Sequence, residues 1–258
     1  MSLSLHDRLE AKNPNYKALI AQGYPIDYIL EQVNIVGLEF KLNKNVLIPR
    51  PETEWLVQSL SQYFNGQMVE ELNAAVEFLK PFQKTLKRSL LVDIGTGSGL
   101  IALGLSPNFT HILATDKYLK ALKVATENAK LNNIANVQFT QSDLLLSQVV
   151  QKWLKQYENS LLIANLPYVP DSDIPKAQEN RISFEPKSAI YSGNDGLQHF
   201  KRLLKQLGKF KLTPRLCIFE LDPRNIQKAF DLGQNYFNMQ IIVNDCNEVP
   251  RFLFCSYI

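Results

Sequence analysis

The sequence has few of the residues that build disulfide frameworks and metal sites. Its 258 residues include only three cysteines and three histidines. The cysteines are scattered, at Cys217, Cys246 and Cys255, and no histidine lies near them in the sequence. We therefore expect no disulfide framework, no metal site, and reduced thiols in a cytoplasmic protein.

Long apolar runs and a strong excess of one charge are also lacking. No apolar stretch is long enough to span a bilayer, and the opening residues MSLSLHDRLEAKN contain no apolar signal-peptide core. The net charge is only +3, whereas a dedicated nucleic-acid binder carries a larger basic excess. This composition predicts neither a membrane partner nor nucleic acid as the direct substrate.

The glycines number only 11, and three of them alternate in one short stretch, LLVDIGTGSGLIAL. There, an apolar run ending at Asp93 indicates a strand, and the apolar pattern after Gly99 indicates a helix. Strand, glycine turn and helix form the first unit of a nucleotide-binding α/β sheet. Without Cβ atoms, the turn lets a ligand lie against the main chain. The glycines alone leave S-adenosylmethionine and NAD(P) equally open as ligands.

Strand and helix patterns alternate from Leu90 onward. Strands are predicted over 90–94, 111–115, 136–140, 160–164, 215–220, 238–243 and 251–256. Helices are predicted over 98–105, 118–131, 146–157, 196–208 and 224–233. The alternation indicates a doubly wound, mostly parallel seven-stranded α/β sheet, closed by an antiparallel hairpin.

The part of the chain before Leu90 has shorter elements. We expect one or two short helices with a break near Asn13-Pro14, then a β-hairpin of strands 36–42 and 46–48 around a turn at Asn43–Asn45. A helix starts at Arg50-Pro51, followed by an amphipathic segment over 61–89 with Met68, Leu72, Val76 and Leu79 at helical spacing. The predicted parts are a helical segment 1–34, a hairpin with connecting helices 35–89, and a nucleotide-binding α/β domain 90–258.

Polar residues follow four predicted strands in succession. Ligands of such sheets bind at the carboxyl ends of the strands. Asp116 could accept hydrogen bonds from a ribose diol, and Asp143 could accept one from the exocyclic amine of adenine while Leu144 packs on the ring. Each aspartate alone would fit a helix N-cap equally well. Together they favour an adenosine-bearing ligand.

The motif Asn165-Leu166-Pro167-Tyr168 follows the fourth predicted strand. An asparagine oxygen and a backbone carbonyl can each accept one N–H of a planar NH2 group and so aim its nitrogen at a methyl donor. Pro167 restricts Leu166 to extended backbone, and Tyr168 offers an aromatic wall. Hydride transfer has no evident need for this motif, so it favours S-adenosylmethionine.

With these motifs the sequence resembles the peptide-chain release factor glutamine methyltransferases, a family of class I S-adenosylmethionine-dependent enzymes. The matching stretches are YPIDYI, LIPRPETE, DIGTGSG, NLPY, RISFEP and GNDGL. The glycine and NLPY motifs are shared by many methyltransferases. RPETE before the glycine turn, with FEP and DGL after NLPY, is more specific.

The resemblance implies methylation of the glutamine N5 in the Gly-Gly-Gln motif of release factors, with S-adenosyl-L-methionine as cofactor, by a protein that we expect to be a monomer. The implied cofactor-binding residues are Asp93, Gly95, Thr96, Gly97, Ser98, Gly99, Asp116, Asp143, Leu144 and Asn165. The implied catalytic and substrate-binding residues are Asn165, Leu166, Pro167 and Tyr168, with Arg50 and Glu54 shaping the floor near the methionine moiety.

The sequence departs from the family pattern in three places. Leu166 stands where a second proline is usual, but a residue before proline is extended anyway, so we expect the carbonyl to keep its direction. Only about two dozen residues precede YPIDYI, which indicates a truncated form of the helical region that docks the protein substrate. The segment over 61–89 is longer than usual.

Two other functions remain open from the sequence. An adenine-N6 methyltransferase acting on rRNA or DNA would use the same acceptors, with Tyr168 stacking on a flipped base. A non-catalytic binding module would keep the fold alone. The modest charge and the RPETE and FEP stretches argue against the first, and the presence of every polar residue that the chemistry requires argues against the second.

Overall fold

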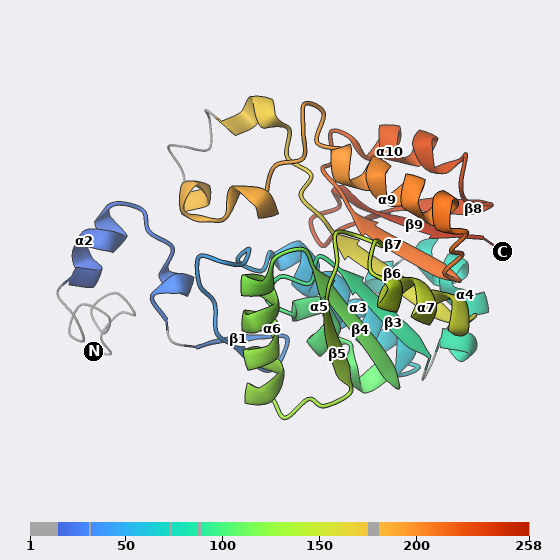
Figure 1. Cartoon of the computed structure of the whole chain (residues 1–258), viewed down its shortest axis with the longest axis horizontal. Helices are drawn as coiled ribbons and strands as arrows, with labels where there is room; N and C mark the ends of the chain where they lie inside the picture. Colours follow the sequence, from blue (N-terminus) through green and yellow to red (C-terminus); the bar gives the residue numbers. More distant parts are fainter. Residues whose placement is uncertain (1–14, 31, 73, 87–88, 175–180, 258) are drawn as a thin grey trace.

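The computed structural model describes residues 15–30, 32–72, 74–86, 89–174 and 181–257. The helix break expected near Asn13-Pro14 lies outside them. Within them, the N-terminal segment contributes a short helix α2 (Asn15–Ala21) and a 3-10 turn η1 (Ile26–Tyr28), which lie at one side of the molecule (Figure 1).

The centre of the protein is the predicted seven-stranded sheet. Its strands are β3 (Leu90–Ile94), β4 (His111–Asp116), β5 (Val137–Gln141), β6 (Ser160–Asn165), β7 (Leu216–Glu220), β8 (Met239–Asn244) and β9 (Pro250–Ser256). They are arranged in the order β5-β4-β3-β6-β7-β9-β8. The first five strands are parallel, and β9 runs antiparallel to both β7 and β8. The predicted fold class and the closing hairpin are therefore confirmed.

Helices cover both faces of the sheet (Figure 1). One face packs against α3 (Pro51–Phe64), α4 (Ala74–Leu86), α5 (Leu100–Gly104) and α6 (Leu119–Leu131). The other packs against α7 (Gln148–Gln156), α9 (Gln198–Phe210) and α10 (Ile226–Gly233). Successive residues of a strand point to opposite faces, so Leu91 joins the first cluster while Leu90 and Val92 join the second.

The strand order places a crevice between β3 and β6. From β3 the chain moves outward to β4 and β5, and then returns to β6 on the other side of β3. Loops that leave neighbouring strands in opposite directions leave a gap at the carboxyl ends, where ligands of doubly wound sheets bind. The glycine turn after β3 and the NLPY motif after β6 therefore face one another across this switch point.

The N-terminal hairpin lies earlier in the chain than predicted. It consists of β1 (Val33–Ile35) and β2 (Leu38–Phe40), joined at Val36 and Gly37, whose φ angles are 49° and 79°. Two central residues with positive φ form the turn that best matches strand twist, so this site determines the register. The predicted turn at Asn43–Asn45 does form, with a hydrogen bond from Val46 N to Asn43 O, but residues 41–50 form no strand.

The amphipathic segment over 61–89 is interrupted. Helix α3 ends at Phe64, where Gly66, at φ 84°, allows the Gln67 N–H to bond back to Gln62 O. Met68 is 88% exposed, so its predicted place on the apolar face was wrong. Helix α4 then begins at Ala74, and Phe78 and Leu79 pack into the same cluster as the sheet.

Candidate active site

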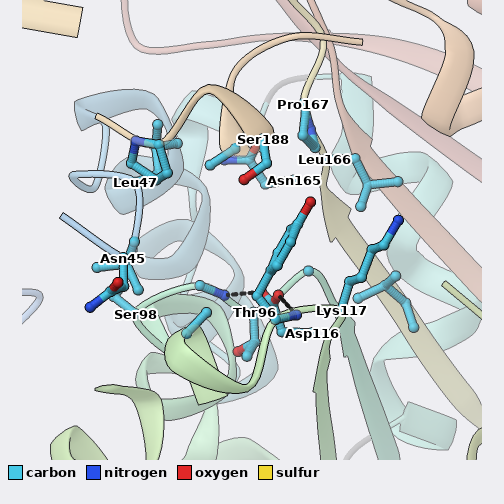
Figure 2. Close-up of a pocket in the computed structure, with 18 of the residues that line it drawn as sticks. Asn45, Leu47, Thr96, Ser98, Asp116, Lys117, Asn165, Leu166, Pro167 and Ser188 are labelled. Carbon is cyan, nitrogen blue, oxygen red and sulfur yellow. Dashed lines mark hydrogen bonds between the residues drawn. The ribbon is translucent and has the colours of Figure 1, made fainter. Parts of the chain in front are cut away.

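A cavity of about 310 Å³ opens at the carboxyl ends of the strands (Figure 2). This volume lies within the usual range for small-molecule sites. Its walls come from the glycine turn (residues 94–98), three further strand ends (residues 116–118, 142–144 and 165–167) and two more distant segments, 44–50 and 186–189. Segment 44–50 contains the first half of LIPRPETE, and segment 186–189 begins at the proline of FEP, so both family-specific motifs border the cavity.

The glycine turn lies closely against its neighbours. The Gly95 and Thr96 N–H groups both donate to Thr115 O of β4, at 2.8 Å. Gly95 has φ 78°, and a Cβ there would lie 3.0 Å from Leu166 Cδ2. Gly97 has φ 54°, another conformation that side chains disfavour. The turn therefore presents bare backbone to the cavity.

Asp93 and Gly99 hold the turn from behind and lie outside the cavity lining. Thr96 Oγ1 and the Ala102 N–H donate to Asp93 Oδ2, at 2.6 and 3.2 Å. Burial raises the pKa of Asp93 to about 7, although these two hydrogen bonds oppose the shift. Gly99, at φ 91°, is the N-cap of α5. Cofactor binding by both stays a prediction, and their contacts in the structure shape the loop.

Asp116 borders the cavity at the end of β4. Its Oδ2 accepts from the Gly97 N–H at 3.1 Å, and its Oδ1 accepts from the Tyr118 N–H at 2.8 Å. Burial raises its pKa, and the backbone N–H groups counteract that shift. A carboxylate has about four acceptor positions, so Asp116 can still accept two hydroxyls.

Asp143 and Leu144 lie at the next strand end. Arg202 Nη2 donates to Asp143 Oδ2 at 2.8 Å, and Lys117 Nζ is 3.6 Å from the same oxygen. Burial alone would raise the pKa of Asp143, but Arg202 and Lys117 lower it overall. Leu144 adopts φ 57° and is buried, and its carbonyl accepts from the Ser142 hydroxyl at 2.5 Å. His199, which the sequence prediction missed, lines the same end and lies 2.7 Å from the Ser192 hydroxyl.

Asn165 lies at the end of β6 with its amide group already engaged on one side. Its Nδ2 donates to Thr53 Oγ1 at 3.0 Å, and Thr53 lies in the first turn of α3. Among the residues that the structure describes, none donates to Asn165 Oδ1. Leu166 and Pro167 line the cavity beside it, as Figure 2 shows.

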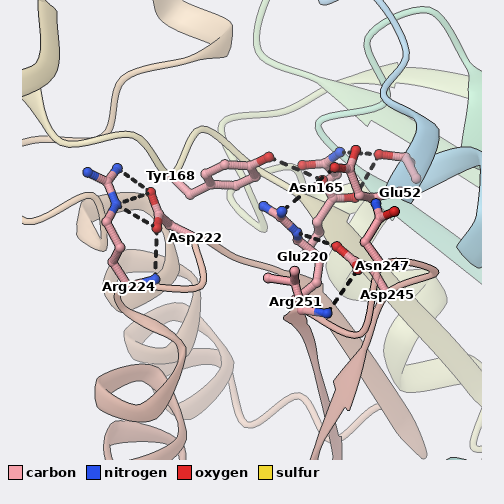
Figure 3. Close-up of polar contacts among 11 residues, drawn as sticks. Glu52, Asn165, Tyr168, Glu220, Asp222, Arg224, Asp245, Asn247 and Arg251 are labelled. Carbon is pink, nitrogen blue, oxygen red and sulfur yellow. Dashed lines mark hydrogen bonds and ion pairs between the residues drawn. The ribbon is translucent and has the colours of Figure 1, made fainter.

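Tyr168 differs from its predicted role as an aromatic wall. It is absent from the described residues that line the cavity, and its hydroxyl donates to Glu220 Oε1 at 3.3 Å (Figure 3). Burial, with the charge of Glu220, raises its pKa far above the ordinary value. Behind it, a Cβ on Gly196 would overlap the Tyr168 carbonyl oxygen, which explains a glycine in the GNDGL stretch.

Arg50 and Glu54 differ in their position relative to the cavity. Arg50 lines the cavity, and its Nη2 donates to Glu185 Oε1 at 2.7 Å, while Glu185 Oε2 accepts from the Ile48 N–H at 2.9 Å. Glu54 is not among the described lining residues; burial and the nearby Asp27 raise its pKa. Thr53 of the same motif, which the sequence prediction missed, lines the cavity together with Arg50.

Glu185 and Glu220 are further residues that sequence reasoning missed. Glu220 ends the fifth predicted strand, so the rule that singled out Asp116 and Asn165 would have found it one strand later. Glu185 is the glutamate of FEP, but only the fold brings it to Arg50. No described helix is long and apolar enough to cross a membrane.

Comparison with known proteins then establishes the family. Release factor glutamine methyltransferase from Thermodesulfovibrio yellowstonii is 31% identical over 89% of this chain and 75% of its own length. The protein of the same name from Coxiella burnetii is 34% identical over 83% of this chain and 68% of its own length. The chain belongs to the release factor glutamine methyltransferase family. A relative of the same name from Fusobacterium nucleatum is 29% identical, and the chain spans 64% of its length.

Broader comparisons agree with this family. The model of the ribosomal protein L11 methyltransferase (PrmA) family matches residues 72–167, from just before α4 to the proline of the NLPY motif. Among solved structures, the hMettl16 catalytic domain in complex with a 3'UTR hairpin aligns over all of this chain and 98% of its own, with 16% identity and a TM-score of 0.61. At that identity the likeness shows the fold alone.

Proposed function

We propose that this protein transfers a methyl group from S-adenosyl-L-methionine to the side-chain amide nitrogen, N5, of the glutamine in the Gly-Gly-Gln motif of peptide-chain release factors. Its membership of the release factor glutamine methyltransferase family supports the reaction. The observation that carries the proposal is the Asn165 carboxamide, whose NH2 is held by Thr53 while its oxygen is left to accept a hydrogen bond.

The cavity suits the proposed cofactor. The bare backbone of Gly95 and Gly97 gives room for a ligand against the turn, and Asp116 has acceptor capacity for the two ribose hydroxyls. Both cations beside Asp143 contact Oδ2, so Oδ1 is available for an adenine amine, with Leu144 next to it. Thr96 and Ser98 complete this wall. When bound, the cofactor supplies a methyl group on a positively charged sulfur, which is a strong electrophile.

The residues after β6 would hold the other reactant. Amide nitrogen is a weak nucleophile because its lone pair is delocalised into the carbonyl. Asn165 Oδ1 and the Leu166 carbonyl would each accept one N–H of the glutamine NH2, which directs the lone pair at the methyl group and favours pyramidal nitrogen. In this orientation the nitrogen would be able to bond to the methyl carbon as that carbon leaves the sulfur with its bonding electrons, and one N–H proton would pass to water.

The substrate side of the cavity is formed by the two family-specific segments. Residues 44–50 and 186–189 line it, and the Arg50–Glu185 ion pair joins them. We infer that these segments receive the Gly-Gly-Gln loop, because they lie on the cavity wall next to Asn165 and Pro167. Glycines beside the glutamine would let its backbone approach so narrow a site.

Purified protein, tritiated S-adenosylmethionine and a release factor test the proposal. We expect label in the release factor, and none when the glutamine of Gly-Gly-Gln is changed to alanine. Asn165→Ala should lower kcat by about 100-fold or more, since one preorganised acceptor is lost. The matched control is Asn136→Ala, just before the edge strand β5, whose Nδ2 donates to the Ser106 and Phe109 carbonyls. Label in RNA or DNA instead of protein would overturn the proposal.

A further inference from the structure

Hydrogen bonds connect Asn165 to two side chains on other elements. Asn165 Nδ2 donates to Thr53 Oγ1 at 3.0 Å, and Thr53 Oγ1 donates to Glu220 Oε2 at 2.7 Å. Thr53 belongs to α3 and Glu220 to the end of β7, and both are buried, at 4% and 3% exposure. Figure 3 shows Glu220 between Asn165 and Arg251, with the Tyr168 hydroxyl directed toward it.

The direction of these bonds decides which way the Asn165 carboxamide faces. A hydroxyl has one proton, and the Thr53 proton is committed to the Glu220 carboxylate. Thr53 Oγ1 can therefore only accept from Asn165. If the carboxamide rotated by half a turn, its oxygen would face the Thr53 oxygen with no proton between them, and a buried acceptor without a donor costs about 1–3 kcal/mol.

A reversed carboxamide would also abolish the proposed chemistry. It would present NH2 to the NH2 of the substrate, so two donors would meet where one acceptor is needed. Without a fixed partner the two orientations differ little in shape. The NLPY motif alone therefore does not determine the orientation of the Asn165 carboxamide. The contacts from α3 and β7 determine it.

We propose that Thr53 and Glu220 are positioning residues for methyl transfer, which act together to keep the Asn165 oxygen, and not its NH2, directed at the substrate amide. This inference rests on the proposed function, because it concerns the group that would hold the glutamine. Neither residue needs to contact the reacting atoms.

The groups around Glu220 and its burial act in opposite directions on its charge. Tyr168 donates to its second oxygen, Oε1, so both oxygens are used. Arg251 is close enough to lower the pKa of Glu220, as the Thr53 hydrogen bond also does, although burial outweighs both and raises it to about 7. Glu52, which pairs with Arg251 at 3.7 Å, and Asp245, bonded to Arg251 at 3.3 Å, complete the charged groups of this cluster.

The kinetic test uses substitutions of similar size. Thr53→Val removes the hydroxyl and keeps the shape, and Thr53→Ser restores the hydroxyl. Thr53→Val should lower kcat for release factor methylation by about 10- to 100-fold, because the acceptor is misdirected for much of the time. The dissociation constant of S-adenosylmethionine should stay within about threefold, and Thr53→Ser should recover most of kcat. The control is Thr126→Val on α6, whose hydroxyl donates to Leu122 O.

A double-mutant cycle shows whether Thr53 acts through Asn165. In an Asn165→Ala background, adding Thr53→Val should change the residual kcat by less than about twofold, because the group being positioned is gone. A further loss equal to that seen in the wild-type background would overturn the inference. So would a Thr53→Val variant that keeps full kcat, or one whose loss lies only in cofactor affinity.

A measurement without substrate separates this inference from the proposed function. The side-chain NH2 signal of Asn165, assigned by its disappearance in Asn165→Asp, should show slow hydrogen exchange in the wild type and fast exchange in Thr53→Val. This result would support the positioning pair even if the wild type failed to methylate a release factor, a failure that would count only against the proposed function. Fast exchange in the wild type would overturn the positioning pair.

Discussion

Arg50 and Glu185 are separated by 135 residues in the sequence, and their side chains meet at 2.7 Å. Glu185 is 2% exposed in its side chain, and it also accepts the Ile48 N–H. One carboxylate thus fixes both the backbone and a side chain of the segment that enters α3. The specific motifs RPETE and FEP are two halves of one structural unit at the mouth of the cavity.

Glu185→Ala should therefore destabilise the protein and weaken substrate binding. Its loss leaves the half-buried Arg50 and the Ile48 N–H without their acceptor, so we expect about 1–3 kcal/mol less free energy of unfolding in urea. The KM for the release factor should rise because residues 44–50 line the cavity. Glu77→Ala, which removes the exposed pair with Lys80, serves as the control and should change stability by less than about 0.5 kcal/mol. Equal effects of the two variants on stability would show that Glu185 does not hold Arg50 and Ile48 in place.

The variant Asp116→Asn tests whether Asp116 binds the ribose of the cofactor. The new NH2 group would face either the Gly97 or the Tyr118 N–H, both of which now donate to the carboxylate. We expect the dissociation constant of S-adenosylmethionine, measured by calorimetry, to rise by about 10- to 100-fold, equivalent to about 1.4–2.8 kcal/mol. The control Asp231→Asn changes an exposed carboxylate on α10 and should leave binding unaltered. Unchanged affinity in Asp116→Asn would argue against Asp116 as the ribose site.

Two glycines with the same backbone angle separate strain from contact. Gly95 has φ 78° and would place a Cβ 3.0 Å from Leu166 Cδ2, whereas Gly37 has φ 79° and nothing within 4 Å. Gly37→Ala should cost only the left-handed strain of about 1–2 kcal/mol. Gly95→Ala should cost more in thermal unfolding and should also weaken cofactor binding. If the two variants behaved alike in both assays, the close approach of Leu166 would be unimportant.

Stability should fall as pH rises from about 5 to 8, in part because of Glu220. Burial is the main reason that its folded-state pKa is about 7, above the ordinary value of 4.5. A raised carboxyl pKa favours the folded state fully below pH 4.5, and this contribution is lost as pH rises through 7. Glu220→Gln removes it, so the stability of this variant relative to the wild type should increase by at most about 3 kcal/mol over that range.

Urea unfolding at several pH values provides the measurement. Asp93, whose pKa burial also raises to about 7, adds a parallel pH dependence to both proteins, so only their difference reports on Glu220. The control Asp231→Asn should follow the wild type at every pH. A difference between Glu220→Gln and the wild type that stayed constant from pH 5 to 8 would contradict the assignment.

The sequence predicted the sheet well because local patterns encode it. The buried parallel strands β4 and β6 are apolar runs that end at Asp116 and Asn165, so these strands and residues could be located. Asp143 could be located because it follows the alternating strand β5. The hairpin was placed wrongly because Asn43–Asn45 has a stronger turn composition than Val36–Gly37. Only the positive φ angles of Val36 and Gly37 identify the actual turn.

Local sequence patterns could not show which of the predicted residues face the cavity and which support it from behind. Asp93 and Asp116 both end apolar strands, yet only Asp116 faces the cavity, because Thr96 and Ala102 enclose the Asp93 carboxylate. The RPETE stretch suggested Arg50 and Glu54, and the helical register instead directs Thr53 toward β7. Such distinctions depend on contacts between residues far apart in the chain.

Glu220 follows Thr53 by 167 positions, and this separation also determines when the protein becomes competent during synthesis. A nascent chain that has emerged only as far as β6 already contains the glycine turn and Asn165, but it lacks the carboxylate that takes the threonine proton. Until β7 pairs with β6, the Asn165 carboxamide has no preferred orientation. An unfinished chain can thus form the cofactor side of the cavity before the Asn165 oxygen is directed at the substrate amide.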